Sequence, residues 1–358
     1  MSSTSNSLYA MAFQKLKKSK IGMISFVYII LCGFIAIFSY ALAPDNSNSA
    51  NVMHVEIHSK APGFTTQILQ VPLPKEHKNS WYSTLISGKK INFNEVPITS
   101  YKLNDTNISV TKYDGTTKDF DSAIFKNQPQ NYIKTQTFYL GTDKFGRDLL
   151  SRILIGARIS FFIGFIAVFI SLLIGIPIGA IAGYYGGKID AFIMWVINIT
   201  WSIPTLLLVI AITLTLGKGF WQVFIAVGLT MWVEVARIVR GQVITVKQQQ
   251  YIEAARALGF SDLRIIFKHI LPNTLAPIIV ISAANFAAAI LIESGLSFLG
   301  IGAQPPTPSW GAIIKNHYNY IVLGKPYLAL IPGMAIMSLV MAFMLLGNAL
   351  RDALDVKT

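Results

Sequence analysis

Long apolar stretches separated by short polar ones make up most of the chain. A stretch of about 20 mostly apolar residues is long enough to cross a bilayer as a helix. Six stretches meet or nearly meet that length, near 21–43, 159–183, 189–216, 219–237, 273–300 and 326–347. The first is too long for the apolar core of a typical signal peptide, so we expect it to be retained. The pattern predicts an all-α polytopic membrane protein with six transmembrane helices.

The pattern changes between the first and second spans. Residues 44–138 are polar and rich in β-branched side chains, and the runs EVPITSYKL and NISVTKYDGTTKDF alternate as strands do. Asp114-Gly115 between two such runs is a signal for a two-residue hairpin turn. We therefore expect an extracytoplasmic insertion over 44–138 that contains a mostly β domain from about 50 to 135.

The predicted organisation is a linear series of segments. A tail, 1–20, precedes the first helix, 21–43, and the insertion, 44–138, follows it. A five-helix core, 139–358, completes the chain and contains a polar loop at 245–272.

Composition and charge agree with a membrane protein. Hydrophobic residues make up 53% of the chain and charged residues 13%, far from the balance of an ordinary soluble domain. The net charge is +13, but the lysines and arginines are dispersed along the chain and no nucleic-acid-binding motif accompanies them. We therefore expect no nucleic-acid partner. The lysine-rich N-terminal tail predicts cytoplasmic N- and C-termini and places the loop after the fourth span on the same side. Cys32 has no partner for a disulfide or a Cys-based metal site within the chain.

Residues 251–272, YIEAARALGFSDLRIIFKHILP, are a hydrophilic, helix-promoting interruption among the later spans. Three alanines favour a short helix, and Gly259 stands where that helix would end in a left-handed cap. We expect Ser261 to cap a second helix and Pro272 to end it. A small-residue face beside Glu253 suits the groove of a partner protein, although an ordinary amphipathic loop helix fits the spacing equally well.

Polar residues inside two spans indicate a pathway across the membrane. The third span contains Asn198 and Pro204, so we expect a kinked helix with polar groups near the break. In the fifth span Ser282, Asn285 and Glu293 fall on one helical face, and an ionisable residue in a span usually faces protein or water. We expect these residues to line the pathway. For Glu293, burial in a structural pair or a place at the outer interface is the alternative.

Signals for catalysis and for metal binding are weak. The nearest match to a Walker A loop, GYYGGKID at 183–190, has the wrong glycine spacing and an isoleucine after the lysine. We therefore expect no enzyme and no cofactor bound by this chain. His54, Glu56 and His58 would share one face of a strand, which is a geometry that can start a metal site. Solvated polar positions on a strand explain the same spacing more simply.

Several motifs resemble one family. Glu253, Ala254, Ala255 and Gly259, followed by Leu271-Pro272, resemble the cytoplasmic EAA loop of permease subunits in binding-protein-dependent ABC importers. Further stretches resemble the second permease subunit of dipeptide and oligopeptide importers: LGTDKFGRDLLSRILIGARIS at 140–160, GYYGGKID, SFLGIGAQPPTPSWG at 297–311 and LRDALD at 350–355. The resemblance covers 138–358 closely and 1–45 loosely, and the segment before LGTD is much longer than is usual in the family.

The resemblance implies a subunit that moves peptides across the cytoplasmic (inner) membrane. The implied partners are a related second permease, an extracytoplasmic peptide-binding protein and two ABC ATPase subunits that hold ATP and Mg²⁺. The implied ATPase-coupling residues are Glu253, Ala254, Ala255, Gly259, Leu271 and Pro272. Other cargoes, such as metal chelates, remain open. So do an ion-driven transporter that uses Glu293 and a membrane-anchored binding module that acts through residues 50–135.

Overall fold

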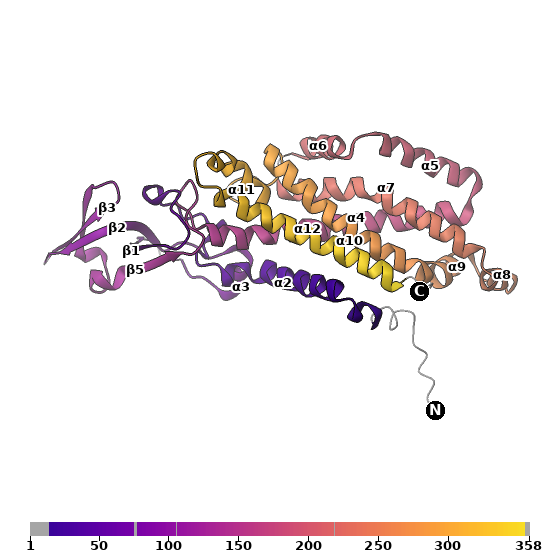
Figure 1. The fold of residues 1–358 in the computed structure, drawn as a ribbon, viewed down its shortest axis with the longest axis horizontal. Helices are drawn as coiled ribbons and strands as arrows, with labels where there is room; N and C mark the ends of the chain where they lie inside the picture. The colour runs from indigo at the N-terminus through magenta and orange to yellow at the C-terminus, as the bar shows by residue number, and fades with distance from the viewer. Residues whose placement is uncertain (1–13, 75–76, 105, 218, 355–358) are drawn as a thin grey trace, which may run out of the picture. The chain divides into compact units, whose positions relative to one another are not determined.

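The computed structural model describes the chain except residues 1–13, 75–76, 105, 218 and 355–358. The described residues form two compact units (Figure 1). One unit contains the residues up to Gly33, Ser160–Ala303 and the residues from Ala335 onward. The other contains Phe34–Ile159 and Gln304–Met334.

Long apolar helices dominate the chain. The longest are α2 (Lys20–Leu42), α4 (Leu149–Tyr185), α7 (Phe220–Lys247), α10 (Leu271–Leu299) and α12 (Tyr327–Leu354). Within the described residues, five helical stretches are long and apolar enough to cross a membrane, and a bent pair makes a sixth if it is counted as one span. The predicted polytopic helical protein is confirmed at this level. The structure adds that several helices extend well beyond the apolar stretches from which they were predicted.

The third predicted span is a broken pair. Helices α5 (Gly187–Ser202) and α6 (Thr205–Leu216) meet at an angle of 89°. The break lies at Ile203-Pro204, where Ile203 is extended with φ −89° and ψ 126°. A residue before proline is sterically driven out of the helical region, and the proline itself has no N–H to donate. The expectation of a kink at Pro204 was right in its position, and the bend of 89° divides the predicted third span into two helices.

Three glycines allow α4 and α7 to pack closely. A Cβ added to Gly175 would lie 2.7 Å from Val235 Cβ, and one added to Gly179 would lie 2.4 Å from the carbonyl oxygen of Ala236. At Gly183 the same atom would lie 2.7 Å from the carbonyl oxygen of Arg240. The ridge of small residues therefore brings two helix backbones into direct contact, as is common between membrane helices.

An ion pair joins α5 to α7. Arg240 Nε and Nη2 donate to the two carboxylate oxygens of Asp190 at 2.5 and 2.6 Å, in a bidentate arrangement. Near it, the guanidinium of Arg237 lies 3.8 Å from the ring centroid of Trp201. These contacts hold α5, the first half of the broken pair, against α7.

The insertion folds around an antiparallel sheet of five strands, in the order β4-β3-β2-β1-β5 (Figure 1). The strands are β1 (Phe64–Pro72), β2 (Phe93–Leu103), β3 (Asn107–Lys112), β4 (Thr117–Asp121) and β5 (Ile133–Phe138). One face buries alternating apolar side chains, among them Leu69, Ile98 and Ile108. A short helix, α3 (Trp81–Ser87), lies in the connection between β1 and β2. The predicted mostly β domain is present, with its sheet between 64 and 138.

The predicted hairpin turn joins β3 to β4, but its loop is longer than two residues. Lys112 N donates to Thr116 O at 2.9 Å, which leaves Tyr113, Asp114 and Gly115 as a three-residue loop. Gly115 has φ +80°, the left-handed conformation that glycine adopts at little cost.

A buried ion cluster precedes α4, within the stretch LGTDKFGRD. Asp143 is fully buried, and its Oδ2 accepts from Arg147 Nε at 2.6 Å. Arg152 Nε lies 3.8 Å from the same oxygen. Lys144 N donates to Nε2 of His317 at 3.3 Å, which connects this loop to the end of α11 (Trp310–His317). The cluster thus fixes the start of α4 to a second, distant segment.

Candidate functional site

The loop between α7 and α10 is a helix, a glycine turn and a second helix. Helix α8 (Gln250–Ala257) ends just before Gly259, which has φ +77°, and α9 (Asp262–Ile265) follows. A π-helical turn at Ile266–Ile270 then continues into α10. The predicted helix-turn-helix and its left-handed glycine are both confirmed (Figure 1).

Apolar residues hold this loop against the ends of the long helices. Ile252 and Ala255 of α8 are buried in one core cluster with Ile265 of α9 and Val239 of α7. The Tyr184 hydroxyl at the end of α4 donates to Asp262 Oδ1 at 2.6 Å. Since α4, α7 and α10 also contribute to this cluster, α8 and α9 are firmly attached to the helices that enter and leave the loop.

The outer side of the loop combines small and large exposed side chains. Glu253 and Ala254 are exposed, whereas Ala255 faces the core. Leu258, Leu263 and Phe267 are 73, 65 and 64% exposed. Large apolar side chains on the outside of a polar loop indicate a surface that another protein covers. The sequence predicted the small residues of this surface but missed the large ones, whose signal was their apolar type within a hydrophilic segment.

Two details of the predicted loop are wrong. Ser261 occupies the cap position of α9, but its side chain makes no capping hydrogen bond. Pro272 does not end a helix, because the helical path runs on from Asp262 to Leu299. The π-helical turn comes directly before Leu271 and Pro272, and a wider turn there accommodates a residue that has no N–H. Pro272 is exposed and Leu271 is half-buried.

The predicted pathway residues occupy two different settings. Asn198 and Pro204, beside and at the break between α5 and α6, are exposed in the isolated chain. In α10 the Ser282 hydroxyl donates to the carbonyl oxygen of Ile278 at 2.7 Å. Asn285 is buried, and no hydrogen bond of its Nδ2 is found within the described part of the chain. The exposed side chain of Asn198, in α5 before the break, is available to a partner or to solvent.

Glu293 is 1% exposed and accepts a hydrogen bond from Ser297 Oγ at 2.7 Å. Ser297 Oγ in turn accepts from Ala303 N at 3.1 Å. This chain of bonds connects the carboxylate to the turn that ends α10. A structural role for Glu293 therefore has direct geometric support.

A cavity of about 510 Å³ lies beside α10 in the same unit. Its lining includes Gln242 of α7, Pro277 and Ala284 of α10, and Arg351 near the end of α12. Three helices, α7, α10 and α12, thus surround a mainly apolar space with a few polar groups.

The expectation that His54, Glu56 and His58 share one face of a strand is wrong. His54, Glu56 and His58 lie in and around a single 3-10 turn, Val55–Ile57, and not on a strand. Glu56 Oε1 accepts from Lys112 Nζ at 3.4 Å, and His54 Nε2 lies 3.4 Å from Glu95 Oε2. Among the residues that the structure describes, no group of three or more His, Cys, Asp or Glu side chains is placed to hold a metal ion.

Comparison with known proteins decides the family. Residues 175–358 match the binding-protein-dependent transport system inner membrane component family, and this range includes the whole helix-turn-helix loop. The chain belongs to that family. It is therefore a multi-pass inner-membrane permease subunit, a transport protein and not an enzyme. Residues 7–62 also match the N-terminal transmembrane domain of oligopeptide transport permease C.

Relatives of this permease align with most of their length. The glutathione transport system permease protein GsiD of Escherichia coli O6:K15:H31 is 45% identical over 61% of this chain and 72% of its own. The dipeptide transport system permease protein DppC of Alkalihalophilus pseudofirmus is 42% identical over 66% of this chain and 78% of its own. A methionine ABC transporter structure in an inward-facing conformation superposes with a TM-score of 0.47 at 19% identity, over 57% of this chain and 96% of that one.

Proposed function

We propose that this permease imports short peptides across the cytoplasmic membrane and that partner subunits hydrolyse the ATP. The observation that carries the proposal is the match to permeases of glutathione and dipeptide systems over about two thirds of the chain. Glutathione is itself a tripeptide, so both relatives' names point to the same class of cargo.

The permease would work together with several partner proteins. Its sequence contains no Walker A loop, so ATP and Mg²⁺ would be held by two ABC ATPase subunits. A second related permease would complete the pathway, and an extracytoplasmic binding protein would deliver the peptide. The N- and C-termini and the loop 245–272 would face the cytoplasm, in agreement with the distribution of lysine and arginine.

Coupling to the ATPase would occur through the exposed side of α8 and α9. Glu253 and Ala254 would contact the ATPase groove directly, and the exposed Leu258, Leu263 and Phe267 would widen the contact. Ala255 would act from the core side by holding α8 in place. Gly259 would set the angle between the two short helices, and Leu271-Pro272 would connect this surface to α10.

The loop's attachment provides a mechanical route into the membrane. ATP binding would close the two ATPases and rock the permeases from an inward-open to an outward-open state. Force applied to α8 would reach α7 and α10 through the shared core cluster. This change from the inward-open to the outward-open state requires nucleotide to bind more tightly to the closed ATPase pair than to the open one. Asn198, Pro204, Ser282, Asn285 and Glu293 are proposed to line or support the path.

Substitutions in the coupling surface should separate ATP hydrolysis from uptake. Glu253→Lys reverses an exposed charge, and Gly259→Val places a β-branched residue at φ +77°, which costs about 1–2 kcal/mol locally. We expect membrane insertion to be retained and uptake per ATP hydrolysed to fall at least about ten-fold. The measurement is peptide uptake and phosphate release in the same vesicles.

Asp119→Lys is the matched control for charge reversal, because Asp119 is exposed on β4, outside the coupling loop. It should leave the ratio of uptake to hydrolysis unchanged. Normal ratios for both Glu253→Lys and Gly259→Val would contradict the coupling role of this loop.

A further inference from the structure

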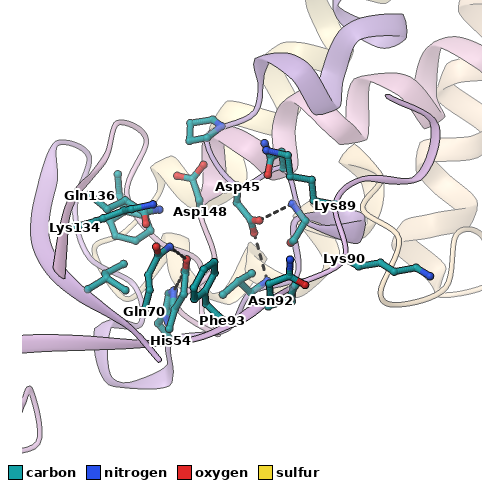
Figure 2. Close-up of a pocket in the computed structure, with 18 of the residues that line it drawn as sticks. Asp45, His54, Gln70, Lys89, Lys90, Asn92, Phe93, Lys134, Gln136 and Asp148 are labelled. Atoms are coloured by element: carbon teal, nitrogen blue, oxygen red, sulfur yellow. Dashed lines mark hydrogen bonds and ion pairs between the residues drawn. The ribbon is translucent and has the colours of Figure 1, made fainter. Parts of the chain in front are cut away.

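The insertion contains a cavity of about 600 Å³ that the transport cycle above does not use. Its walls come from the loop after α2, from three strands and from the segment that precedes β2 (Figure 2). Ile68 and Gln70 on β1 face it together with Gln136 and Phe138 on β5, because alternate residues of a strand point to the same face. The cavity is therefore built by the side of the sheet opposite its main apolar core.

Two acidic residues of this cavity, Asp45 and Asp148, are joined through Ser151, whose Oγ accepts from Asp45 N and donates to Asp148 Oδ2. Burial raises the pKa of Asp45 by more than hydrogen bonds from Ser47 and Val52 lower it, and the charge of Glu95 raises it further. Burial also raises the pKa of Asp148, and the charge of Asp45 adds to that effect. Carboxylates that repel each other while partly desolvated favour the binding of a cation. An ammonium group is the simplest organic cation that can donate to both.

Hydrogen bonds and nearby positive charge favour the ionised form of a third carboxylate, Glu95. Glu95 accepts from Gln70 Nε2 at 2.8 Å, and His54 Nε2 lies 3.4 Å from its other oxygen. Burial opposes ionisation of Glu95, but the bonds from His54 and Gln70 and the charge of Lys134 together lower its pKa. His54 is 3% exposed, and its Nδ1 has no hydrogen-bond partner within the described part of the chain. A buried unpaired nitrogen costs free energy that a bound ligand can recover.

Lysines and apolar side chains line the same cavity as the carboxylates. Figure 2 shows Lys134 and Lys89 on either side of the Asp45 and Asp148 carboxylates. Both lysines are exposed and lie on different segments of the cavity wall, so their ammonium groups can reach a carboxylate at its mouth. Phe93 and other apolar residues line part of the same space. Acidic, basic and apolar groups thus surround one small volume.

We propose that this cavity binds a short peptide with free termini. Its ammonium group would pair with Asp45 and Asp148, its carboxylate with Lys89 and Lys134, and a side chain would pack on Phe93. The choice of a peptide rests on the proposed import function. The volume of about 600 Å³ lies within the ~300–1,000 Å³ that is usual for small-molecule sites, which suits a ligand of two or three residues. The permease would then bind its cargo independently of the binding protein.

The test is calorimetry on the full-length chain in lipid nanodiscs, without ATPases or binding protein. The ligands are trialanine, N-acetyl-trialanine and trialanine amide. We expect saturable binding of trialanine and at least about ten-fold weaker binding of each blocked form, since each one loses a charge pair. Absence of saturable binding, or equal affinity for the three ligands, would overturn the proposal.

Two variants test which charged side chain binds each end of the peptide. Asp45→Asn removes the charge but keeps an oxygen that can accept from Ser47 N, and it should bring trialanine to the affinity of N-acetyl-trialanine. Lys134→Gln should abolish the preference for trialanine over its amide, and it keeps the proposal testable if Asp45→Asn fails to fold. Lys102→Gln, an exposed lysine on β2 outside the cavity lining, is the matched control and should bind as the native chain does.

Failure of this site and failure of the import function give different results. ATP-driven uptake by the complete importer without binding to the isolated permease would overturn the cavity and leave the import function standing. Selective binding of trialanine without ATP-driven uptake would support the cavity and contradict the import function.

Discussion

Replacing Gly179 with leucine should prevent the permease core from folding. A Cβ at this position would lie 2.4 Å from the carbonyl oxygen of Ala236 and 2.9 Å from Val239 Cβ. The first neighbour is backbone, so relief requires α4 and α7 to move apart. Overpacking commonly costs about 1–3 kcal/mol, and a clash with backbone should lie at or above the upper end. We expect almost no monodisperse protein in detergent, as measured by fluorescence-detected size-exclusion chromatography.

Gly241→Leu is the matched control, because Gly241 is also in α7 and nothing lies within 4 Å of an added Cβ there. Its yield and melting temperature should stay near those of the native chain. Gly179→Ala should give an intermediate loss. Native yield and native melting temperature for Gly179→Leu would contradict the close contact of α4 and α7.

Replacing Asp143 with alanine should cause the second large loss. Asp143 is fully buried and pairs with Arg147 at 2.6 Å, while Arg152 lies 3.8 Å away. Its Oδ1 also accepts from the backbone N–H of Phe145 at 2.8 Å. Without the carboxylate, two buried guanidinium groups repel each other, and removing one partner of a buried ion pair costs about 3–5 kcal/mol. We expect a markedly lower melting temperature for the detergent-solubilised chain.

Asp119→Ala tests whether this loss is specific. Asp119 is exposed on β4, so its substitution should change the melting temperature little. If Asp143→Ala melts at the same temperature as Asp119→Ala, the cluster at the start of α4 does not stabilise the fold.

Hydropathy predicted the spans well but not the ends of the helices. The second span was expected from 159, whereas α4 begins at Leu149. The additional turns include Ser151 and Arg152. A hydropathy profile leaves these residues out of the predicted span because their side chains are polar. In the fold Ser151 donates to Asp148 and Arg152 donates to backbone oxygens of Ser49 and Ala50. The partners of Arg152 lie 103 and 102 residues away, and Ser151 Oγ also accepts from Asp45 N, 106 residues away, so a local window cannot detect these contacts.

The residue types predicted the left-handed turn at Gly259 but not the continuation of the helix through Pro272. A left-handed turn depends on the residue that occupies it, and glycine signals that conformation wherever it ends a helix. The effect of a proline depends on the turn before it, because a π-helical turn over Ile266–Ile270 lets the helical path continue. The sequence of that turn carries no clear sign of the wider geometry.

The cavity in the insertion could not be predicted from sequence order. Strand β5 pairs with β1, although three strands lie between them in the chain. This pairing places Lys134 opposite Ile68 and Gln136 opposite Thr66, and the loop after α2 adds Asp45. The sequence instead suggested His54, Glu56 and His58 as a group, because they are neighbours along the chain. In the fold His54 joins the cavity wall, whereas Glu56 pairs with Lys112.

The central claim is that this permease moves peptides with ATP hydrolysed by partner subunits. The direct measurement is uptake of a labelled tripeptide into proteoliposomes that contain this chain, its partner permease and two ATPases, with the peptide-loaded binding protein outside. We predict that uptake requires ATP inside the vesicles and stops when this chain is omitted. Uptake by the permease without ATPases, driven by an ion gradient, would contradict the account.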